Sequence, residues 1–290
     1  MGTLFESKAA IEPDYMRKKK AVEKKLGHEI SRAEFEEHYL EMNGGGSRLS
    51  DTGTSIFDPV LTEIMVGWFT AKGDNVIDPF AGGSVRGIVT GTLCRNYTGI
   101  DLRQEQIDAN IAQGDELQPD IMPVWICGDS LNIRDLAPGE YDFILTCPPY
   151  GNLEVYSDDP ADISNMPDED FDRVYTDILY RTVSMLKDNR FACVVVGNYR
   201  DKKGFLRDLV GLTVQAMEKA GARYYNDFIT VTPIGSLPIR AGKAFQASRK
   251  MGRTHQYALI FVKGDPKKAT ERLGEVELPD MESFITDDEE

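Results

Sequence analysis

The sequence lacks the features that would place it in several common protein classes. No apolar run approaches the ~18 residues of a membrane-spanning helix, and the N-terminal stretch has no apolar core of a secretory signal. The four cysteines stand far apart, and together with the three histidines they form no metal-binding spacing. We therefore expect no membrane contact, no metal site, and reduced thiols in a cytoplasmic protein.

Positive charge is also scarce: 33 Lys and Arg stand against 48 Asp and Glu, a net charge of −15. A protein that grips nucleic acid over its whole surface would be basic, so any such contact here must be local. Residues 240–268 are the exception, with eight basic residues and one acid. Residues 271–290 reverse this with nine acids and one arginine. This acidic segment either competes with nucleic acid for the basic segment or is simply a solvated chain end.

Composition divides the chain into three predicted parts. Residues 1–47 form a helical extension, with apolar positions at helical spacing over 7–43, closed by a flexible GGGS joint. Residues 48–268 form the main domain, and residues 269–290 form an acidic, disordered tail. The N-terminal helix could also mediate formation of a homodimer.

The main domain alternates short apolar runs with longer amphipathic ones. This alternation predicts an α/β fold with a Rossmann-like, seven-stranded sheet, helices on both faces, and a last pair of antiparallel strands. The predicted strands are 75–78, 97–101, 123–127, 141–146, 191–197, 223–233 and 255–263. The predicted helices are 84–93, 103–113, 170–187 and 205–220.

Acidic residues end three of these strands. Asp78 precedes a glycine-containing turn, Asp101 lies 23 residues later, and Asp129 follows the third strand. Ligands of such sheets bind at the carboxyl ends of the strands, where an acid about 20 residues beyond the glycine turn accepts from ribose. Three acids without a GxGxxG motif favour S-adenosylmethionine over a dinucleotide. The alternative is that each acid merely caps a helix.

Two motifs carry a family resemblance. DPFAGGS (78–84) resembles motif I of the DNA amino-methyltransferases, and SIFDPVLTEIMVGWF (55–69) resembles their motif X. The resemblance implies a methyltransferase sheet and a set of cofactor-binding residues: Phe57, Pro59, Asp78, Pro79, Phe80, Gly82, Ser84, Asp101, Asp129 and Thr146. Arg86 is outside the usual pattern, and we interpret it as a surface helix residue in preference to one that reaches the cofactor carboxylate.

The fourth strand runs into Cys147-Pro148-Pro149-Tyr150, the predicted catalytic tetrad. Prolines fix the turn and leave carbonyls that can accept protons of an exocyclic amine, while the tyrosine ring stacks on a planar base. The tetrad resembles motif IV of the same family, which usually begins with Asp, Asn or Ser. Cysteine is a weaker acceptor, so either the Pro148 carbonyl carries most of the role or the substrate amine is less demanding.

The motif order resembles the γ arrangement, and residues 51–265 resemble phage-type, restriction-modification DNA methylases of a bacterial or phage-infected cell. The resemblance implies DNA as partner, with the target base flipped or single-stranded. Segments 151–168 and 234–254 are the predicted substrate loops, the first with Tyr156 and the second with Phe245 as candidate stacking residues. The predicted DNA-binding residues are Arg240, Lys243, Arg249, Lys250 and Arg253.

The sequence leaves three functions open. Methylation of DNA, with adenine N6 favoured over cytosine N4, is the main prediction. RNA and protein N-methyltransferases use a similar Pro-Pro-Tyr tetrad, although no RNA-binding domain is evident here. A cofactor-binding, base-flipping module without turnover is the third, and Cys147 is its main support.

Overall fold

The computed structural model describes Glu23 and residues 57–151, 157, 159–201, 203–231 and 237–276, excluding the side chains of residues 237–240. The predicted N-terminal helix apart from Glu23, the glycine-rich joint, Tyr156 and residues 277–290 lie outside the described residues. Within the described part, no helix is long and apolar enough to cross a membrane.

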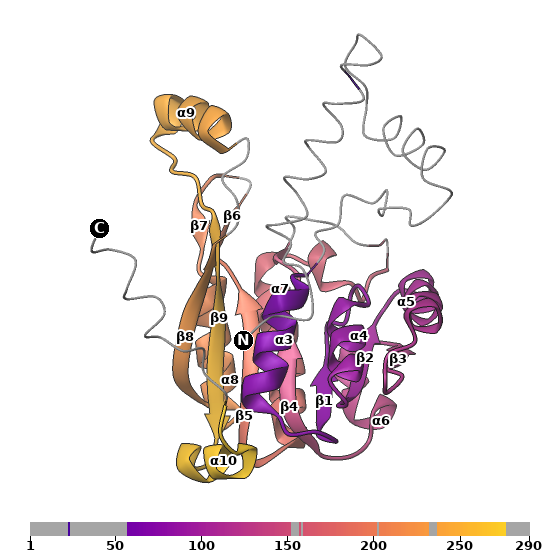
Figure 1. The fold of residues 1–290 in the computed structure, drawn as a ribbon. Helices are drawn as coiled ribbons and strands as arrows, with labels where there is room; N and C mark the ends of the chain where they lie inside the picture. The colour runs from indigo at the N-terminus through magenta and orange to yellow at the C-terminus, as the bar shows by residue number, and fades with distance from the viewer. Residues whose placement is uncertain are drawn as a thin grey trace, which may run out of the picture.

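A seven-stranded sheet in the order β3-β2-β1-β4-β5-β9-β8 forms the centre of the molecule (Figure 1). Its strands are β1 (Asn75–Asp78), β2 (Asn96–Asp101), β3 (Val124–Cys127), β4 (Tyr141–Thr146), β5 (Leu186–Val196), β8 (Arg223–Val231) and β9 (His255–Lys263). The first five are parallel, and β9 runs antiparallel to both β5 and β8. The predicted seven strands and antiparallel last pair are confirmed.

Helices cover both faces of the sheet because side chains of its central strands alternate between two apolar clusters. In β4, Ile144 points to one cluster, whereas Phe143 and Leu145 point to the other. The Ile144 side is covered by α6 (Ile133–Leu136), α7 (Asp168–Met185) and α8 (Leu209–Lys219). The opposite side is covered by α3 (Pro59–Phe69), α4 (Val85–Thr92), α5 (Gln104–Leu117) and α10 (Pro266–Leu273).

The predicted helix over 205–220 is wrong at its start. Asp208 caps α8 by accepting from the Gly211 N–H at 3.0 Å, so the helix begins only at Leu209. The residues before the cap form β7 (Leu206–Arg207), which pairs with β6 (Tyr199–Arg200) as a separate hairpin. This β6–β7 hairpin was not predicted, because its two strands are too short to show a period.

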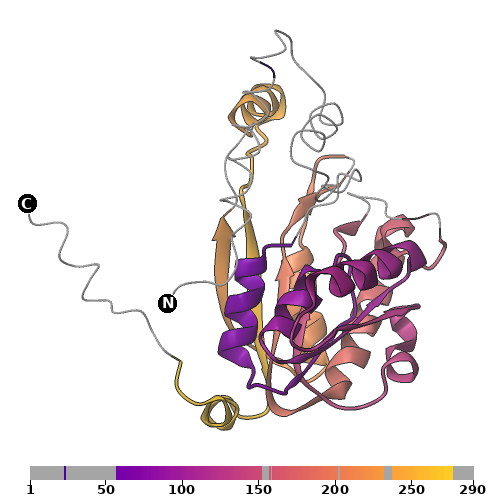
Figure 2. The same cartoon turned by 45° about the vertical axis from the view of Figure 1, so that its right-hand side comes forward.

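Two segment boundaries also differ from expectation. The predicted loop 234–254 contains α9 (Leu237–Ser248), a helix that stands away from the sheet (Figures 1 and 2). The predicted tail from 269 begins inside α10, where Arg272 Nη1 donates to Asp74 at 2.8 Å. The folded part therefore continues past the expected boundary.

Candidate active site

The strands β1, β2 and β4 end side by side at one edge of the sheet, and their last residues are Asp78, Asp101 and Thr146. Strand β5 ends at this edge with Val196, which pairs with Tyr257 near the start of β9. The last residue of β8, Val231, pairs with His255, the first residue of β9. The segment between β8 and β9, which includes α9, therefore lies at the same edge. The fold thus brings the predicted cofactor residues and the predicted substrate segments to the same side of the molecule.

Asp78 is the centre of a buried hydrogen-bond network and has no exposed surface. Its carboxylate accepts from Arg86 Nε at 2.7 Å, from the Tyr97 hydroxyl at 2.8 Å and from Thr146 Oγ1 at 2.6 Å. The backbone N–H of Phe80 adds a fourth bond at 3.0 Å. A buried carboxylate that accepts four hydrogen bonds is fixed in place.

Arg86 is an internal residue, so the interpretation as a surface helix residue is wrong. It is 5% exposed, and its Nη2 donates to the carbonyls of Phe80 and Ala81 at 2.7 and 2.9 Å. Its guanidinium lies 4.6 Å from the centre of the Phe57 ring. Burial acts to lower the pKa of Arg86, but the charge and hydrogen bond of Asp78, together with Tyr97 and Cys147, outweigh it and hold the pKa above its usual range. Arg86 is therefore a permanent cation beside the strand tips.

The glycine turn after β1 borders open space. Gly82 adopts φ +49°, and a Cβ built on Gly82 or Gly83 meets no atom of the described residues within 4 Å. The turn is tied to β2 because the Gly82 N–H donates to Asp101 Oδ2 at 3.0 Å. Burial raises the pKa of Asp101, against the hydrogen bond and charge of Arg103. A ligand can approach this backbone closely, with an acceptor alongside.

The other predicted cofactor residues have local structural roles. Asp129 caps a 3-10 turn (Ser130–Asn132) by accepting from the Leu131 N–H at 2.8 Å, which is the capping role left open for it. The Pro79 carbonyl accepts from Ser130 Oγ at 2.6 Å. The Ser84 hydroxyl donates to the Gln113 side chain, and Pro59 is the first residue of α3.

The tetrad lies directly beyond β4, and its tyrosine is held from two sides. Gln256 Nε2 on β9 donates to the Tyr150 hydroxyl at 2.6 Å. The Tyr199 ring on β6 meets the Tyr150 ring edge-on, with centroids 6.4 Å apart. Gly151 follows at φ +52°, a left-handed conformation that favours glycine. Residues 198–201, which follow the fifth strand, were expected at this edge, but the contacts of Tyr199 and Gln256 with Tyr150 were not predicted, since nothing in the sequence links them to position 150.

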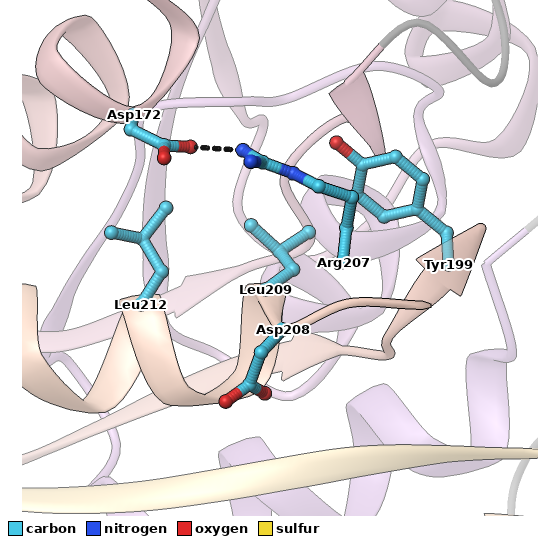
Figure 3. A pocket seen from close by; sticks show the side chains of 6 residues that line it. All are labelled: Asp172, Tyr199, Arg207, Asp208, Leu209 and Leu212. Atoms are coloured by element: carbon cyan, nitrogen blue, oxygen red, sulfur yellow. Dashed lines mark hydrogen bonds and ion pairs between the residues drawn. The ribbon is translucent and has the colours of Figure 1, made fainter. Parts of the chain in front are cut away.

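A pocket of about 180 Å³ opens on the other side of Tyr199 (Figure 3). Arg207 crosses it and pairs with Asp172 at 2.7 Å and with Asp168 at 3.6 Å. Leu209 and Leu212 from α8 also line it, and Asp208 completes the lining. The charge of Arg207 is therefore compensated within the protein.

The predicted DNA-binding residues fall on α9 and the segment after it. Lys243, Arg249 and Arg253 are exposed, and Lys250 is half-buried. Arg240 lies in α9, with its side chain outside the described residues. The Arg249 guanidinium lies 5.1 Å from the centre of the Phe245 ring.

Comparison with known proteins gives a family and a fold. The family model described as DNA methylase, of the N6/N4 type, matches residues 141–285, which are 145 of the 290 residues. A methyltransferase from Pyrococcus furiosus matches with a TM-score of 0.50 and 15% identity over 81% of this chain and 97% of that chain. TrmN from Thermus thermophilus matches with a TM-score of 0.48 and 15% identity over 71% of this chain.

The chain spans about half the length of the Thermus thermophilus protein, 49%. Comparison with curated proteins gave no match. At such low identity the match to the Pyrococcus furiosus structure establishes the fold, and the sequence-based prediction of a methyltransferase sheet is confirmed.

Proposed function

The chain belongs to the N6/N4 DNA methylase family, and from this membership we propose that it methylates adenine N6 in DNA in preference to cytosine N4. The family reaction is the S-adenosylmethionine-dependent methylation of exocyclic amines of DNA bases, so the chain is a transferase with DNA as its substrate. The proposal concerns the base, the residues that act, and the state of the DNA.

One hydrogen bond carries the assignment of the site. Thr146, the residue before the tetrad, donates to Asp78 at the tip of β1 at 2.6 Å. The turn that receives the amine and the turn that receives the cofactor are thereby held together by a buried contact. Such rigidity matters because transfer depends on the alignment of the nitrogen with the methyl group.

The residues at the strand tips fit S-adenosylmethionine. The open space beside Gly82 and Gly83 admits the amino-acid portion, and the Asp101 carboxylate would accept from the ribose hydroxyls. Asp129 and Phe80 would flank the adenine, with Phe57, Pro59, Pro79 and Ser84 shaping the site. When bound, the cofactor supplies an electrophilic methyl group on its sulfonium.

Arg86 takes over part of the role first given to Asp78. Because the Asp78 carboxylate already accepts four hydrogen bonds, we assign it the positioning of Arg86 and of Thr146. Nε and Nη2 of Arg86 are bound to protein oxygens, whereas Nη1 has no hydrogen-bond partner among the described residues. A guanidinium in this place would bind the cofactor carboxylate.

The tetrad binds and orients the exocyclic amine of the target base. The carbonyls of Cys147 and Pro148 would accept hydrogen bonds from the N–H groups of the exocyclic amine and direct its lone pair outward. The Tyr150 ring, fixed by Gln256 and Tyr199, would stack on the base. No general base is required, because the amine loses its proton to solvent after transfer. The base must be flipped or unpaired to reach this corner, and Arg240, Lys243, Arg249, Lys250 and Arg253 would contact phosphates.

Methyl transfer from labelled S-adenosylmethionine tests the proposal. Phage and plasmid DNA, total RNA and a protein extract are offered separately, followed by mass spectrometry of the nucleosides released from the DNA. N6-methyladenine in the DNA is the expected product. Label in RNA, in protein or in nothing would refute it, and N4-methylcytosine would correct the base. An intracellular location and a homodimer are further expectations, which fractionation and light scattering can check.

A further inference from the structure

The β6–β7 hairpin has a rigid turn that holds one aromatic residue outward. Beyond the pair Arg200–Leu206, the Asp201 N–H donates to the Phe205 carbonyl at 2.9 Å, and the Phe205 N–H donates to Asp201 Oδ1 at 2.8 Å. Gly204 completes the turn at φ +90°. Phe205 is therefore a fixed position of the hairpin, opposite Asp201.

Phe205 lies on the face of the hairpin that leads to the tetrad. Residues directly opposite each other share a face, and so do residues two apart, so Phe205, Arg207 and Tyr199 lie on one side. Tyr199 is 6% exposed and packs against Tyr150, whereas Phe205 is 71% exposed. Phe205 stands two residues from Arg207, the partner of Tyr199 in the hairpin, and two residues of strand span about 7 Å.

The same hairpin and the segment packed on its turn also carry cations. Arg200 and Lys203 are exposed on the same hairpin, and the ammonium of Lys250 takes the space where a Cβ on Gly204 would stand. Lys250 thereby joins the hairpin to the basic segment after α9. An exposed aromatic among cations suits a nucleic-acid strand, whose bases stack and whose phosphates attract the charges. It does not suit an apolar protein partner.

We propose that Phe205 stacks on a base of the DNA strand next to the target nucleotide while Tyr150 holds the target itself. The proposal rests on the proposed function and adds a specific residue to the recognition of DNA. It replaces Phe245 as the stacking residue outside the active corner, because Arg249 already lies over the Phe245 ring.

Fluorescence anisotropy with a labelled single-stranded DNA of mixed sequence measures the contribution of the ring. Phe205→Ala should weaken binding by roughly 5- to 150-fold at every salt concentration, without a change in the slope of log affinity against log salt. Phe205→Trp should restore binding, and its added emission should be quenched by the DNA. Tyr180→Ala, which removes another exposed aromatic ring, on α7, is the matched control and should bind like the wild type. Phe245→Ala is measured for comparison. Calorimetry with S-adenosylmethionine should give the same affinity for all five proteins.

The outcomes separate the two proposals. If the wild type methylates DNA but Phe205→Ala binds as tightly as the wild type, the stacking role is wrong and the function stands. Loss in Phe245→Ala instead of Phe205→Ala also overturns it, as does a loss seen with RNA of the same sequence but not with DNA. If the wild type methylates no DNA, the proposed function itself fails.

Discussion

The two halves of the active edge are built in opposite ways. On the cofactor side, Asp78 and Arg86 are 0% and 5% exposed, and each group is fixed by several hydrogen bonds. On the substrate side, Phe205 and Met251 are 71% and 73% exposed, among cations that face solvent. From this difference we infer that the cofactor side is organised before any ligand arrives, and we expect the substrate side to become ordered when DNA binds.

The largest expected effect comes from breaking the cofactor side. Asp78→Asn leaves the buried Arg86 cation without its partner, so we expect a loss of about 3–5 kcal/mol in the free energy of unfolding and no cofactor binding. Denaturant melts and calorimetry measure both. The double variant Asp78→Asn with Arg86→Met should recover part of the stability but not the cofactor binding. Wild-type cofactor affinity in either variant would contradict the site.

The junction between the halves is tested at Tyr150. Tyr150→Ala removes the stacking surface and should lower the rate of methyl transfer by about a hundredfold, with cofactor affinity unchanged. Tyr150→Phe keeps the ring and loses the bond from Gln256, so its rate should fall by roughly tenfold or less. Equal rates for Ala and Phe would mean that the ring does not hold the base.

The substrate side is tested through its salt dependence. Replacing Arg249, Lys250 and Arg253 by Ala should reduce the salt slope of DNA binding by about 3. Between 50 and 200 mM salt, the wild type should then lose roughly sixty-fold more affinity than the triple variant, as counterion release predicts. An unchanged slope would show that the phosphate contacts lie at other residues. The matched control is Lys267→Ala with Lys268→Ala on α10, which should leave the slope alone.

The smallest effect is expected at the opposite edge of the sheet, where a buried cluster of ion pairs lies away from the proposed ligand sites. Asp142 pairs with Lys187 at 2.9 Å and Arg190 at 2.8 Å. Burial acts to raise the pKa of Asp142, but these two cations outweigh it and the pKa lies below its usual value. The resulting stability is present above the unfolded-state pKa and is lost as the pH falls through the lower folded-state pKa.

Asp142→Asn should therefore cost about 1.5 kcal/mol at neutral pH and progressively less under acid conditions. Methyl transfer per folded molecule should not change. Melts between neutral and acid pH measure this, and a constant difference across that range would show that the cluster of ion pairs contributes nothing through its charge.

Local sequence carried most of the fold because buried strands and amphipathic helices have readable periods. The predicted strand 255–263 coincides with β9, and the strand tips at Asp78 and Asp101 lie side by side as their positions in a parallel sheet require. The β6–β7 hairpin and α9 were missed. The hairpin is too short to show a period, and α9 packs little of its surface on the sheet.

The sequence by itself determined the strand-ending acids, the glycine turn and the proline corner, because each is a local chain conformation dictated by residue type. Only the tertiary structure decided which of these residues contact one another. Arg86 turned inward because Asp78 offered a buried counter-charge, and Gln256 reached Tyr150 across 106 positions of the chain. Such pairings depend on strand order and burial, which no short stretch of sequence encodes.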